Sequence, residues 1–373
     1  MSSTHFIVFS GYNQRAVIAF LRTAQAVGAQ IAIVAAGAAD TIFLSDYAKY
    51  VVFTREDLSL AWPVFAETLC AVRAKLPVGR YVIAPTTEAL NRFIVHHRQA
   101  VCRAGFEIPL VEEDLYRLLS DKAAFVEVCR QHGFRVPNEY GSLDDAPLPL
   151  VAKPRQYLGA DGKAHAPVLI WSEFDRERCR ANMHAGEWFF QDFVRGESFY
   201  LFYFFSRKGE VYRFSQRNLL QQPEGKSVLA AVPAAWHETD IAQQYEGLLK
   251  SLSYHGPIML ELRALAGGGY CMIEANPRFW GPSQLCVDAG RNFMQAFLAD
   301  EDSSLPPPVF SSPIPPETRY FWHGGLCDAL RKGQTPAVLA DDFDWKASLD
   351  DWIAYDVYRR PDTMRIYSRE TCT

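Results

Sequence analysis

The sequence of 373 residues predicts a protein of mixed α/β plus α+β class. An N-terminal Rossmann-like domain with a parallel sheet is expected to precede a region of antiparallel sheets. Strands and helices alternate in the first part of the chain, which is typical of a parallel sheet covered by helices. Consecutive strands joined by short turns follow later, which is typical of antiparallel hairpins. The length also exceeds that of one ordinary domain, so we expect two or three.

The first domain is expected to comprise residues 1–115. The stretch "THFIVFSG" is typical of a buried strand, and "NQRAVIAFLRTAQAVG" has apolar residues at helical spacing. A strand "AQIAIVAA", a short helix and a strand in "DTIFLSDYAKYVVF", a helix "LAWPVFAETLCAVRAKL" and a strand "RYVIAP" continue the alternation. Tyr12, Asn13 and Glu88 stand at strand ends, where ligands often bind such sheets.

The first strand–helix turn of this domain, "SGYNQRA", contains one glycine. A dinucleotide-binding turn needs the pattern G-x-G-x-x-G, so NAD binding is not supported. The turn is either an ordinary strand–helix connection or a helix N-terminus that receives an anion.

Residues 116–300 are expected to form a second domain. Its first helix opens at "SDKAAF", with Ser120 or Asp121 as the N-cap. A strand then runs to Lys153, and a small lid subdomain is expected over about 138–190. Further on, "SRKGE" turns a hairpin, "DIAQQYEGLLKSLSYHG" forms an amphipathic helix, and "GRNFMQAFLAD" forms another.

The stretch "SSLPPPVFSSPIPPE" is rich in proline and serine and indicates a surface crossing. It stands near the start of an extension, taken as residues 301–373, which also contains "FWHGG" and "DWIAYDVYRRPD". Because these segments are aromatic, we expect the extension to pack on the core.

Composition and charge exclude several partners. The net charge of −5 and the pI near 6.0 argue against nucleic acid and against an anionic membrane, both of which need a basic surface. No apolar run reaches the roughly 18 residues that cross a bilayer, and no signal peptide is expected. Eight cysteines, none at C-x-x-C spacing, indicate reduced thiols in a cytoplasmic protein rather than a zinc site.

The stretch "YCMIEANPRFWGPS" (270–283) reads as a strand, and "IMLELRALAGGG" as its hairpin partner. Side chains alternate between the faces of a strand, so Met272, Glu274 and Asn276 are expected on one face. If the turn is centred on Gly267 and Gly268, Glu261 lies opposite Glu274.

Two carboxylates that face each other across a hairpin repel, but a cation between them reverses the sign of the interaction. Two carboxylates and one amide are oxygen ligands that suit Mg²⁺ when phosphates and waters complete its shell. Arg278 follows, where it could hold a phosphate or a developing negative charge. The other interpretation is a pair of solvated glutamates on an exposed sheet face.

The motif "IEANPR", with an acidic residue 13 positions upstream, resembles the closing strand of the metal–ATP site in the ATP-grasp superfamily. The order "SDKAAF…HGFRVP", "LVAKP", "FFQDFVRGES", "MLELR" and "MIEANPR" is similar to its carboxylate–amine ligase and carbamoyl-phosphate-synthetase-like branches, over about residues 5–300. The resemblance implies an ATP-grasp architecture: a Rossmann-like domain, a small lid subdomain and a C-terminal antiparallel-sheet domain.

The resemblance also implies roles for particular residues. Lys122 and Lys153 would meet ATP, Gln191 and the backbone of Phe193 and Val194 would bind adenine, and Glu197 would take the ribose hydroxyls. Glu261, Glu274 and Asn276 would hold Mg²⁺, with Mn²⁺ as an alternative, and Arg278 would grip the transferred phosphoryl group or the acyl phosphate. Arg217 is expected near the phosphates or the substrate.

The sequence departs from the family at one point. The lid loop of the family is often rich in consecutive glycines, but here it is "KPRQYLGADGKAHAP", with separated glycines. The phosphate grip of the loop is therefore expected to depend on Arg155 or Lys163.

The resemblance implies an ATP-dependent ligase that joins a small-molecule carboxylate to an amine, such as an amino acid or a small peptide, through an acyl phosphate. Two alternatives stay open: a phosphotransferase that stops at a phosphorylated product, and a regulatory protein that binds nucleotide without turnover. The sequence also leaves a homodimer open.

Overall fold

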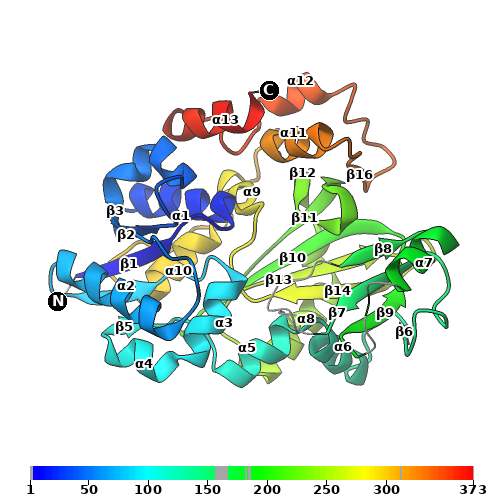
Figure 1. Ribbon diagram of the computed structural model, residues 1–373, viewed down its shortest axis with the longest axis horizontal. Coiled ribbons are helices and arrows are strands. Elements are labelled where there is room, and N and C mark those ends of the chain that lie inside the picture. The colour runs from blue at the N-terminus through cyan, green and yellow to red at the C-terminus, as the bar shows by residue number, and fades with distance from the viewer. Residues whose placement is uncertain (1–2, 156–166, 181–182, 184–185, 311–312, 373) are drawn as a thin grey trace.

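The computed structural model describes residues 3–155, 167–180, 183, 186–310 and 313–372. Three sheets organise these residues (Figure 1): a parallel sheet near the N-terminus, a small antiparallel sheet and a long antiparallel sheet. Among the described residues, none of the helices combines the length and the apolar composition that a membrane span requires.

The parallel sheet confirms the predicted Rossmann-like domain and has the strand order β3-β2-β1-β4-β5. Its strands are β1 (Thr4–Phe9), β2 (Gln30–Ala35), β3 (Val51–Thr54), β4 (Arg80–Ile83) and β5 (Phe106–Glu107). Its helices are α1 (Gln14–Ala26), α2 (Trp62–Lys75), α3 (Glu88–His96) and α4 (Arg98–Arg103), and two 3₁₀ turns, Thr41–Leu44 and Asp46–Tyr50, form the short helical stretch before β3.

Both faces of β1 are covered by other elements, which explains why the strand carries apolar residues on both faces. Phe6 contacts Phe20 of α1 with ring centroids 6.4 Å apart, whereas Phe9 stacks on Phe65 of α2 at 5.4 Å on the other face. Continuous burial of this kind is characteristic of parallel strands.

The long antiparallel sheet has the order β14-β13-β10-β11-β12-β15, and β16 also pairs with β11. Its strands are β10 (Glu197–Phe205), β11 (Val211–Gln221), β12 (Val228–Ala234), β13 (Gly256–Ala264), β14 (Tyr270–Asn276), β15 (Tyr320–Phe321) and β16 (Ala337–Val338). The predicted "SRKGE" hairpin joins β10 to β11, and the Ser206 N–H donates to the Glu210 carbonyl at 2.9 Å. The amphipathic helix α8 (Asp240–Ser251) covers one face, where the Tyr203 hydroxyl donates to the Ala242 carbonyl.

The small antiparallel sheet has the order β6-β9-β7-β8. Its strands are β6 (Glu139–Tyr140), β7 (Leu150–Pro154), β8 (Val168–Ile170) and β9 (Trp188–Asp192), with α7 (Glu173–Arg180) beside them. Helices α5 (Glu113–Ser120) and α6 (Lys122–Gln131) lead into it from the parallel-sheet domain. Figure 1 shows this sheet at the far side of the long sheet from the N-terminal domain.

The parallel sheet and the long antiparallel sheet share one apolar core. Helices α9 (Ser283–Asp288) and α10 (Phe293–Glu301) lie between them. Phe297 of α10 contacts Phe6 at 6.1 Å, and Trp280 stacks on Phe202 of β10 with centroids 4.2 Å apart. The division into domains at residue 115 therefore describes chain order, while packing joins the two parts.

The extension adds two strands to the long sheet and covers α1 with helices. These are α11 (His323–Arg331), α12 (Leu349–Ile353) and α13 (Met364–Thr371), shown above α1 and β12 in Figure 1. β15 pairs with β12, and Trp352 joins a cluster with Leu229 and Phe321. Three further 3₁₀ turns complete the described elements: Pro223–Gly225, Trp236–Glu238 and Pro361–Thr363.

Candidate active site

The predicted carboxylate pair is present in the β13–β14 hairpin. Glu261 pairs directly with Glu274, Leu260 with Ala275, and Met259 with Asn276. This register places the two carboxylates on one face of the long sheet.

The hairpin corrects the expected face of Met272. The turn is held by the Gly268 N–H on the Leu265 carbonyl, and the pairing next to it joins Ala264 to Tyr270 and Leu262 to Met272. The register shifts by one residue between this part and the Glu261–Glu274 pair, which leaves Ile273 as a bulge. A bulge reverses the alternation, so Met272 lies on the apolar face with Leu262 and not beside Glu274.

Basic side chains from two other elements reach the carboxylate pair. Lys122, the first residue of α6, places its Nζ 2.9 Å from Oε2 of Glu274. Lys153, at the end of β7, is 6% exposed and directs its Nζ to the carbonyl of Ile273 at 3.4 Å. The bulge carbonyl therefore helps to hold the ammonium group of Lys153 against the hairpin.

The two carboxylates differ in their readiness to ionise. Burial opposes the charge of Glu274, but Lys122, Asn276 and Lys153 outweigh it and lower the pKa of this carboxyl to about 2. Burial raises the pKa of Glu261, and the charge of Glu274 adds to this effect, although Arg263 acts against both. A cation placed between the two carboxylates would favour the ionised form of both.

Lys153 loses its proton at a lower pH than an ordinary lysine does. Burial lowers the pKa of Lys153 to about 8, and the neighbouring charge of Lys122 contributes in the same direction. The two carboxylates act in the opposite direction without restoring the ordinary value. An anion next to Lys153 would favour the charged form of its ammonium group.

Asn276 and Arg278 continue the site beyond β14. The Asn276 amide donates to Glu274 at 2.9 Å, and its oxygen accepts from Arg278 at 3.0 Å. The Nε of Arg278 lies 3.5 Å from the carboxylate of Glu88, at the start of α3. The chain of contacts therefore runs from the carboxylate pair into the parallel-sheet domain.

Gln191 lies on the same face of the small sheet as Lys153, because Val151 pairs with Gln191 and Lys153 with Phe189. Its side chain is 1% exposed, and neither amide atom has a hydrogen-bond partner among the described residues. Leaving such a group unpaired costs about 1–3 kcal/mol, so a ligand is the natural partner.

The hinge residues follow this strand. Phe193 donates its N–H to the Pro149 carbonyl at 3.3 Å, and its ring lies 4.7 Å from Trp171. Val194 follows in the connection from β9 to β10.

Glu197 and Arg217 lie apart from the carboxylate pair. They form an ion pair with each other, and Arg217 also contacts Asp342 of the extension with two hydrogen bonds, of 2.7 and 3.0 Å. Arg217 pairs with Phe199, and Phe199 with Leu262, in a row on the apolar face of the sheet. The structure therefore does not bring Arg217 to the face that holds Glu261.

Of the two basic residues expected to grip phosphate from the lid loop, the structure describes Arg155. Arg155 lies 3.7 Å from Glu139 and has its guanidinium carbon 5.6 Å from the Phe189 ring centroid. Lys163 lies outside the described residues.

Sequence reasoning missed a polar row beside Glu261. Tyr200 pairs with Glu261, and Gln216 pairs with Tyr200, so all three share a face. The Gln216 amide donates to Asn218 at 2.6 Å, and Asn218 donates to Ser198 at 3.0 Å. The signal was present, because Gln216 and Asn218 stand two residues apart in one strand and therefore share a face.

The residues present fit a magnesium ion. Glu261, Glu274 and Asn276 offer oxygen donors on one face, and the hard oxygen set is the one that Mg²⁺ prefers. Within the described residues, no group of three or more His, Cys, Asp or Glu side chains gathers as a metal site. A site of two carboxylates and one amide therefore needs ligand oxygens from a phosphate or water to be complete.

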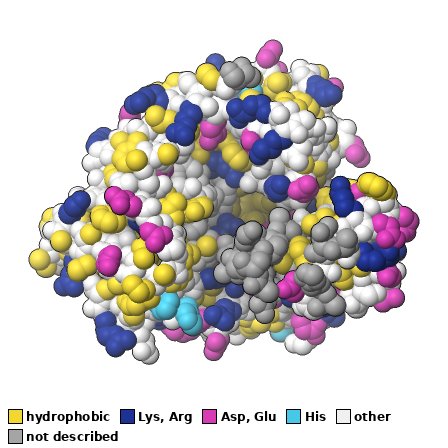
Figure 2. All heavy atoms as spheres, in the orientation of Figure 1, with side chains coloured by type: hydrophobic (Ala, Val, Ile, Leu, Met, Phe, Trp, Pro, Cys, Tyr) yellow, Lys and Arg dark blue, Asp and Glu magenta, His cyan; other side chains and the backbone are white. Residues whose placement is uncertain are grey.

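The surface is hollowed in front of this region. Figure 2 shows a recess at the centre of the face, between the N-terminal domain and the antiparallel sheets, with Lys and Arg side chains inside it. A concave, basic surface of this kind attracts anionic ligands.

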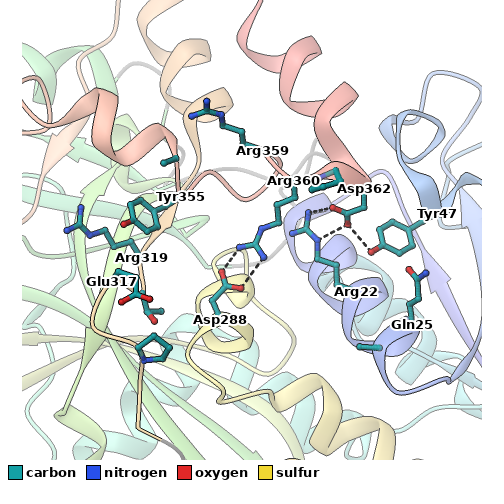
Figure 3. Close-up of a pocket in the computed structure, with 15 residues that line it drawn as sticks. Arg22, Gln25, Tyr47, Asp288, Glu317, Arg319, Tyr355, Arg359, Arg360 and Asp362 are labelled. Atoms are coloured by element: carbon teal, nitrogen blue, oxygen red, sulfur yellow. Dashed lines mark hydrogen bonds and ion pairs between the residues drawn. The ribbon is translucent and has the colours of Figure 1, made fainter.

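A separate cavity of about 800 Å³ lies between α1 and the extension and contains none of the predicted site residues. In Figure 3, Arg319, Tyr355 and Glu317 lie on one side of it, and Arg22 and Tyr47 on the other. Ion pairs between Arg22 and Asp362 (2.8 Å) and between Arg360 and Asp288 (2.5 Å) hold its walls together. We interpret these pairs as contacts that join the extension to the core.

Solved structures of other proteins share this fold. The ADP complex of N5-carboxyaminoimidazole ribonucleotide synthetase has a TM-score of 0.62 and 17% identity, covering 83% of this chain and 79% of its own. The biotin carboxylase domain of 2-oxoglutarate carboxylase from Hydrogenobacter thermophilus has a TM-score of 0.60 and 15% identity, covering 80% and 70%. Biotin carboxylase from Campylobacter jejuni has a TM-score of 0.59 and 15% identity, covering 83% and 73%.

No protein-family model and no curated protein sequence matches the chain. The likeness is therefore one of structure, and it extends over 83% of this chain for the first of these neighbours. From this architecture and these likenesses together, the chain has the ATP-grasp fold.

Proposed function

We propose that this protein is an ATP- and Mg²⁺-dependent ligase, which activates a carboxylate as an acyl phosphate and transfers the acyl group to an amine. The amine is an amino acid or a small peptide, and the product is an amide. The observation that carries the proposal is the facing pair of Glu261 and Glu274 with Lys122 and Lys153 directed at the same hairpin.

The chain's residues divide the work of binding. Lys122 and Lys153 hold the phosphates of ATP, the unpartnered amide of Gln191 meets the adenine edge with the backbone of Phe193 and Val194, and Glu197 takes the ribose hydroxyls. Because Arg217 forms an ion pair with Glu197, we assign it to positioning that carboxylate and not to the phosphates.

The phosphoryl group is transferred next to the hairpin. A substrate carboxylate oxygen attacks the γ-phosphorus of ATP, the bond to the ADP oxygen breaks, and an acyl phosphate forms. The amine nitrogen then attacks the acyl carbon, phosphate leaves, and the nitrogen loses a proton. Arg278 holds the oxygens of the transferred group in a bidentate contact, and Lys153 neutralises charge that develops on them.

Glu261, Glu274 and Asn276 would hold Mg²⁺, which neutralises phosphate charge when bound. Closing the small sheet over the long one would keep water from the acyl phosphate.

The structural neighbours support nucleotide use. The synthetase of similar fold is an ADP complex, and the 2-oxoglutarate carboxylase domain is a dimer with MgADP, ADP and bicarbonate. By analogy we propose that this chain also forms a homodimer and works in the cytoplasm on small molecules.

Thermal unfolding with ATP alone, Mg²⁺ alone and both together tests the site. A ligand that binds only the folded state raises the unfolding midpoint. We expect a rise that requires both components and that Glu274→Ala abolishes, together with a loss of ADP release of about 100-fold or more. Glu224→Ala, at an exposed glutamate in a turn, serves as the matched control and should behave like the unchanged protein.

Two results would contradict the proposal: no shift with ATP and Mg²⁺ together, or a shift that survives Glu274→Ala. ADP release separates the alternatives that the sequence left open. Release that depends on an added amine supports the ligase. Release without any amine supports a phosphotransferase, and nucleotide binding without release supports a regulatory protein.

A further inference from the structure

A second cavity, of about 250 Å³, lies at the carboxyl ends of the parallel strands. In sheets of this type, ligands bind in the crevice outside those strand ends. The cavity is formed by the end of β1, the residues after β3 and the start of α3. Its walls include Phe9, Tyr12, Arg55, Leu58, Leu60 and Glu88.

Arg55 is the unusual member of this wall. It is 6% exposed, yet it has no hydrogen bond or ion pair from its guanidinium group among the described residues. Its guanidinium carbon lies 5.4 Å from the centroid of the Phe9 ring. Buried charges are normally paired, so a buried arginine that faces a cavity without a partner points to an anionic ligand.

The carboxylate of Asp40 does not fill this role. The charge of Asp40 acts on Arg55, but its oxygens already accept hydrogen bonds from Ser10, from the Ala36 N–H at 2.7 Å and from the Ile42 N–H at 2.9 Å. Asp40 thus belongs to the turn after β2 and leaves the donors of Arg55 unused.

The other residues that line the cavity indicate that the rest of the ligand is apolar. Leu58, Leu60 and Leu90 are apolar, and the aromatic ring of Tyr12 is 56% exposed at the rim. Exposed apolar side chains around a concave site are typical of a binding surface. A ligand with one acid group and an apolar body would satisfy both Arg55 and these walls.

The cavity adjoins the proposed active site through Glu88. This residue lines the cavity, and its carboxylate lies 3.5 Å from Arg278, which contacts Asn276. A molecule anchored on Arg55 would therefore lie in a cavity that adjoins the place where we propose that the acyl phosphate forms. Glu88 is already paired with Arg92 at 2.8 Å. It is therefore not an unpaired carboxylate that could bind an amino group of the ligand.

We propose that the amine substrate is an α-amino acid with an apolar side chain, and that Arg55 binds its α-carboxylate in this cavity. The inference rests on the proposed ligase function. The acid group on Arg55 is held away from the hairpin and stays intact in the product. The amine must instead be free to attack, and an α-amino acid carries both groups on one carbon atom.

The test compares acids with their amides, which differ in the charged group that Arg55 would bind. L-leucine and L-phenylalanine at millimolar concentration should raise the unfolding midpoint of the protein with MgATP present. L-leucinamide and L-phenylalaninamide should bind at least about tenfold more weakly, as expected when a charge-assisted pair is lost. Inorganic phosphate serves as a second anion and should neither shift the midpoint nor displace the acids.

Three variants locate the effect. Arg55→Met should abolish the difference between acid and amide, Arg55→Lys should weaken acid binding because a point charge replaces a planar fork, and Tyr12→Ala at the exposed rim should weaken acid and amide alike. Arg359→Met removes an exposed arginine from the other cavity and should change nothing.

Several outcomes would overturn the proposal: no shift with either acid, equal binding of acid and amide, unchanged acid binding in Arg55→Met, or Arg55-dependent binding of phosphate alone. If Arg55→Met does not fold, the Arg55→Lys and Tyr12→Ala variants decide in its place. The MgATP shift is recorded in every sample. Its absence would count against the ligase itself, whereas its presence without an acid shift would count against this inference alone.

Discussion

At the scale of single residues, the candidate site contains ionisable side chains whose charged forms are disfavoured by burial. Lys153 shows this most clearly, because it is buried beside another lysine and yet adjoins two carboxylates. The geometry supplies an ammonium group that gains most when a phosphate arrives. Such pre-arranged charge is what phosphoryl transfer requires.

Lys153 predicts a pH dependence of nucleotide binding. Its pKa in the folded protein is about 8, below the ordinary value of 10.5, so the ammonium is lost as the pH rises through about 8. The sign for stability is opposite: the unfolded chain keeps the proton up to its higher pKa, so this group opposes folding less as the pH rises between the two values. For binding, the affinity for MgATP should fall above about pH 8, with a slope that approaches tenfold per pH unit.

Calorimetric titration with MgATP across this range measures the slope. Lys153→Arg should remove it, because a guanidinium group stays charged throughout. Lys250→Arg, at an exposed lysine paired with Glu246, is the control and should keep it. A slope that is unchanged in Lys153→Arg would show that another group titrates.

The residues of the site were predictable where strand alternation and a motif agreed. Glu261 and Glu274 face each other as expected. The face of the sheet on which Met272 lies was not predictable. One bulged residue reverses the alternation, and no residue type in the sequence indicates the bulge. Arg217 illustrates a second limit: its neighbour Gln216 lies on the face of Glu261, and a shift of one position sends the side chain to the other face.

At the scale of elements, helix α6 positions Lys122. The helix begins at this residue, and the Asp121 side chain caps it by accepting from the N–H groups of Ala123 at 3.0 Å and Ala124 at 2.8 Å. The cap thus confirms one of the two predicted residues, Asp121, and fixes the start of the helix. Fixing the start also fixes the direction in which Lys122 leaves the backbone toward Glu274.

Loss of this cap should therefore affect stability and binding together. Asp121→Ala should lower the free energy of unfolding by about 1 kcal/mol, the usual value for an N-cap. It should also weaken MgATP binding, because the first turn frays and Lys122 loses its fixed origin. Chemical denaturation and calorimetric titration measure the two effects.

Asp121→Asn is the matched control, since an asparagine caps about as well as an aspartate. It should preserve both properties. If Asp121→Ala destabilised the protein with no change in MgATP affinity, the cap would be purely structural.

Elements with clear local signals were predictable, and connections were less so. The strand–helix alternation, the "SRKGE" turn and the helix in "GRNFMQAFLAD" all follow from spacing and turn residues within a few positions. The short helix before β3 proved to be two 3₁₀ turns, each opened by a side chain, Asp40 and Ser45. The pairing of β15 and β16 with the long sheet could not be predicted, because each has two residues and pairs with a strand distant in sequence.

At the scale of the whole molecule, Arg15 joins three parts of the chain. It belongs to α1 and is 8% exposed. Its guanidinium donates to the Val228 carbonyl at 3.3 Å and to the Ser227 hydroxyl at 2.9 Å, both in or beside β12, and to the Tyr320 hydroxyl in β15 at 2.9 Å. Its guanidinium carbon also lies 3.8 Å from the Trp322 ring centroid in the extension.

These contacts predict that the extension and the N-terminal domain unfold together. Arg15→Met removes the shared donor and leaves three acceptors without it, two of which are buried, so the free energy of unfolding should fall by about 2–4 kcal/mol. Arg130→Met removes an arginine whose pairing with Glu127 lies at the surface, and it should cost no more than about 0.5 kcal/mol. Denaturant titration followed by tryptophan fluorescence and by far-ultraviolet circular dichroism measures both variants.

The shape of the transition decides what Arg15 does. The unchanged protein should unfold with coincident curves for the two probes, because one core runs through the parallel sheet, α10 and the long sheet. In Arg15→Met the tryptophan curve should move to lower denaturant than the circular dichroism curve, because Trp322 and Trp352 of the extension report its early release. Two curves that shift equally would show that the extension is held mainly by β15, β16 and the Arg22–Asp362 and Arg360–Asp288 pairs, with Arg15 adding stability to the whole.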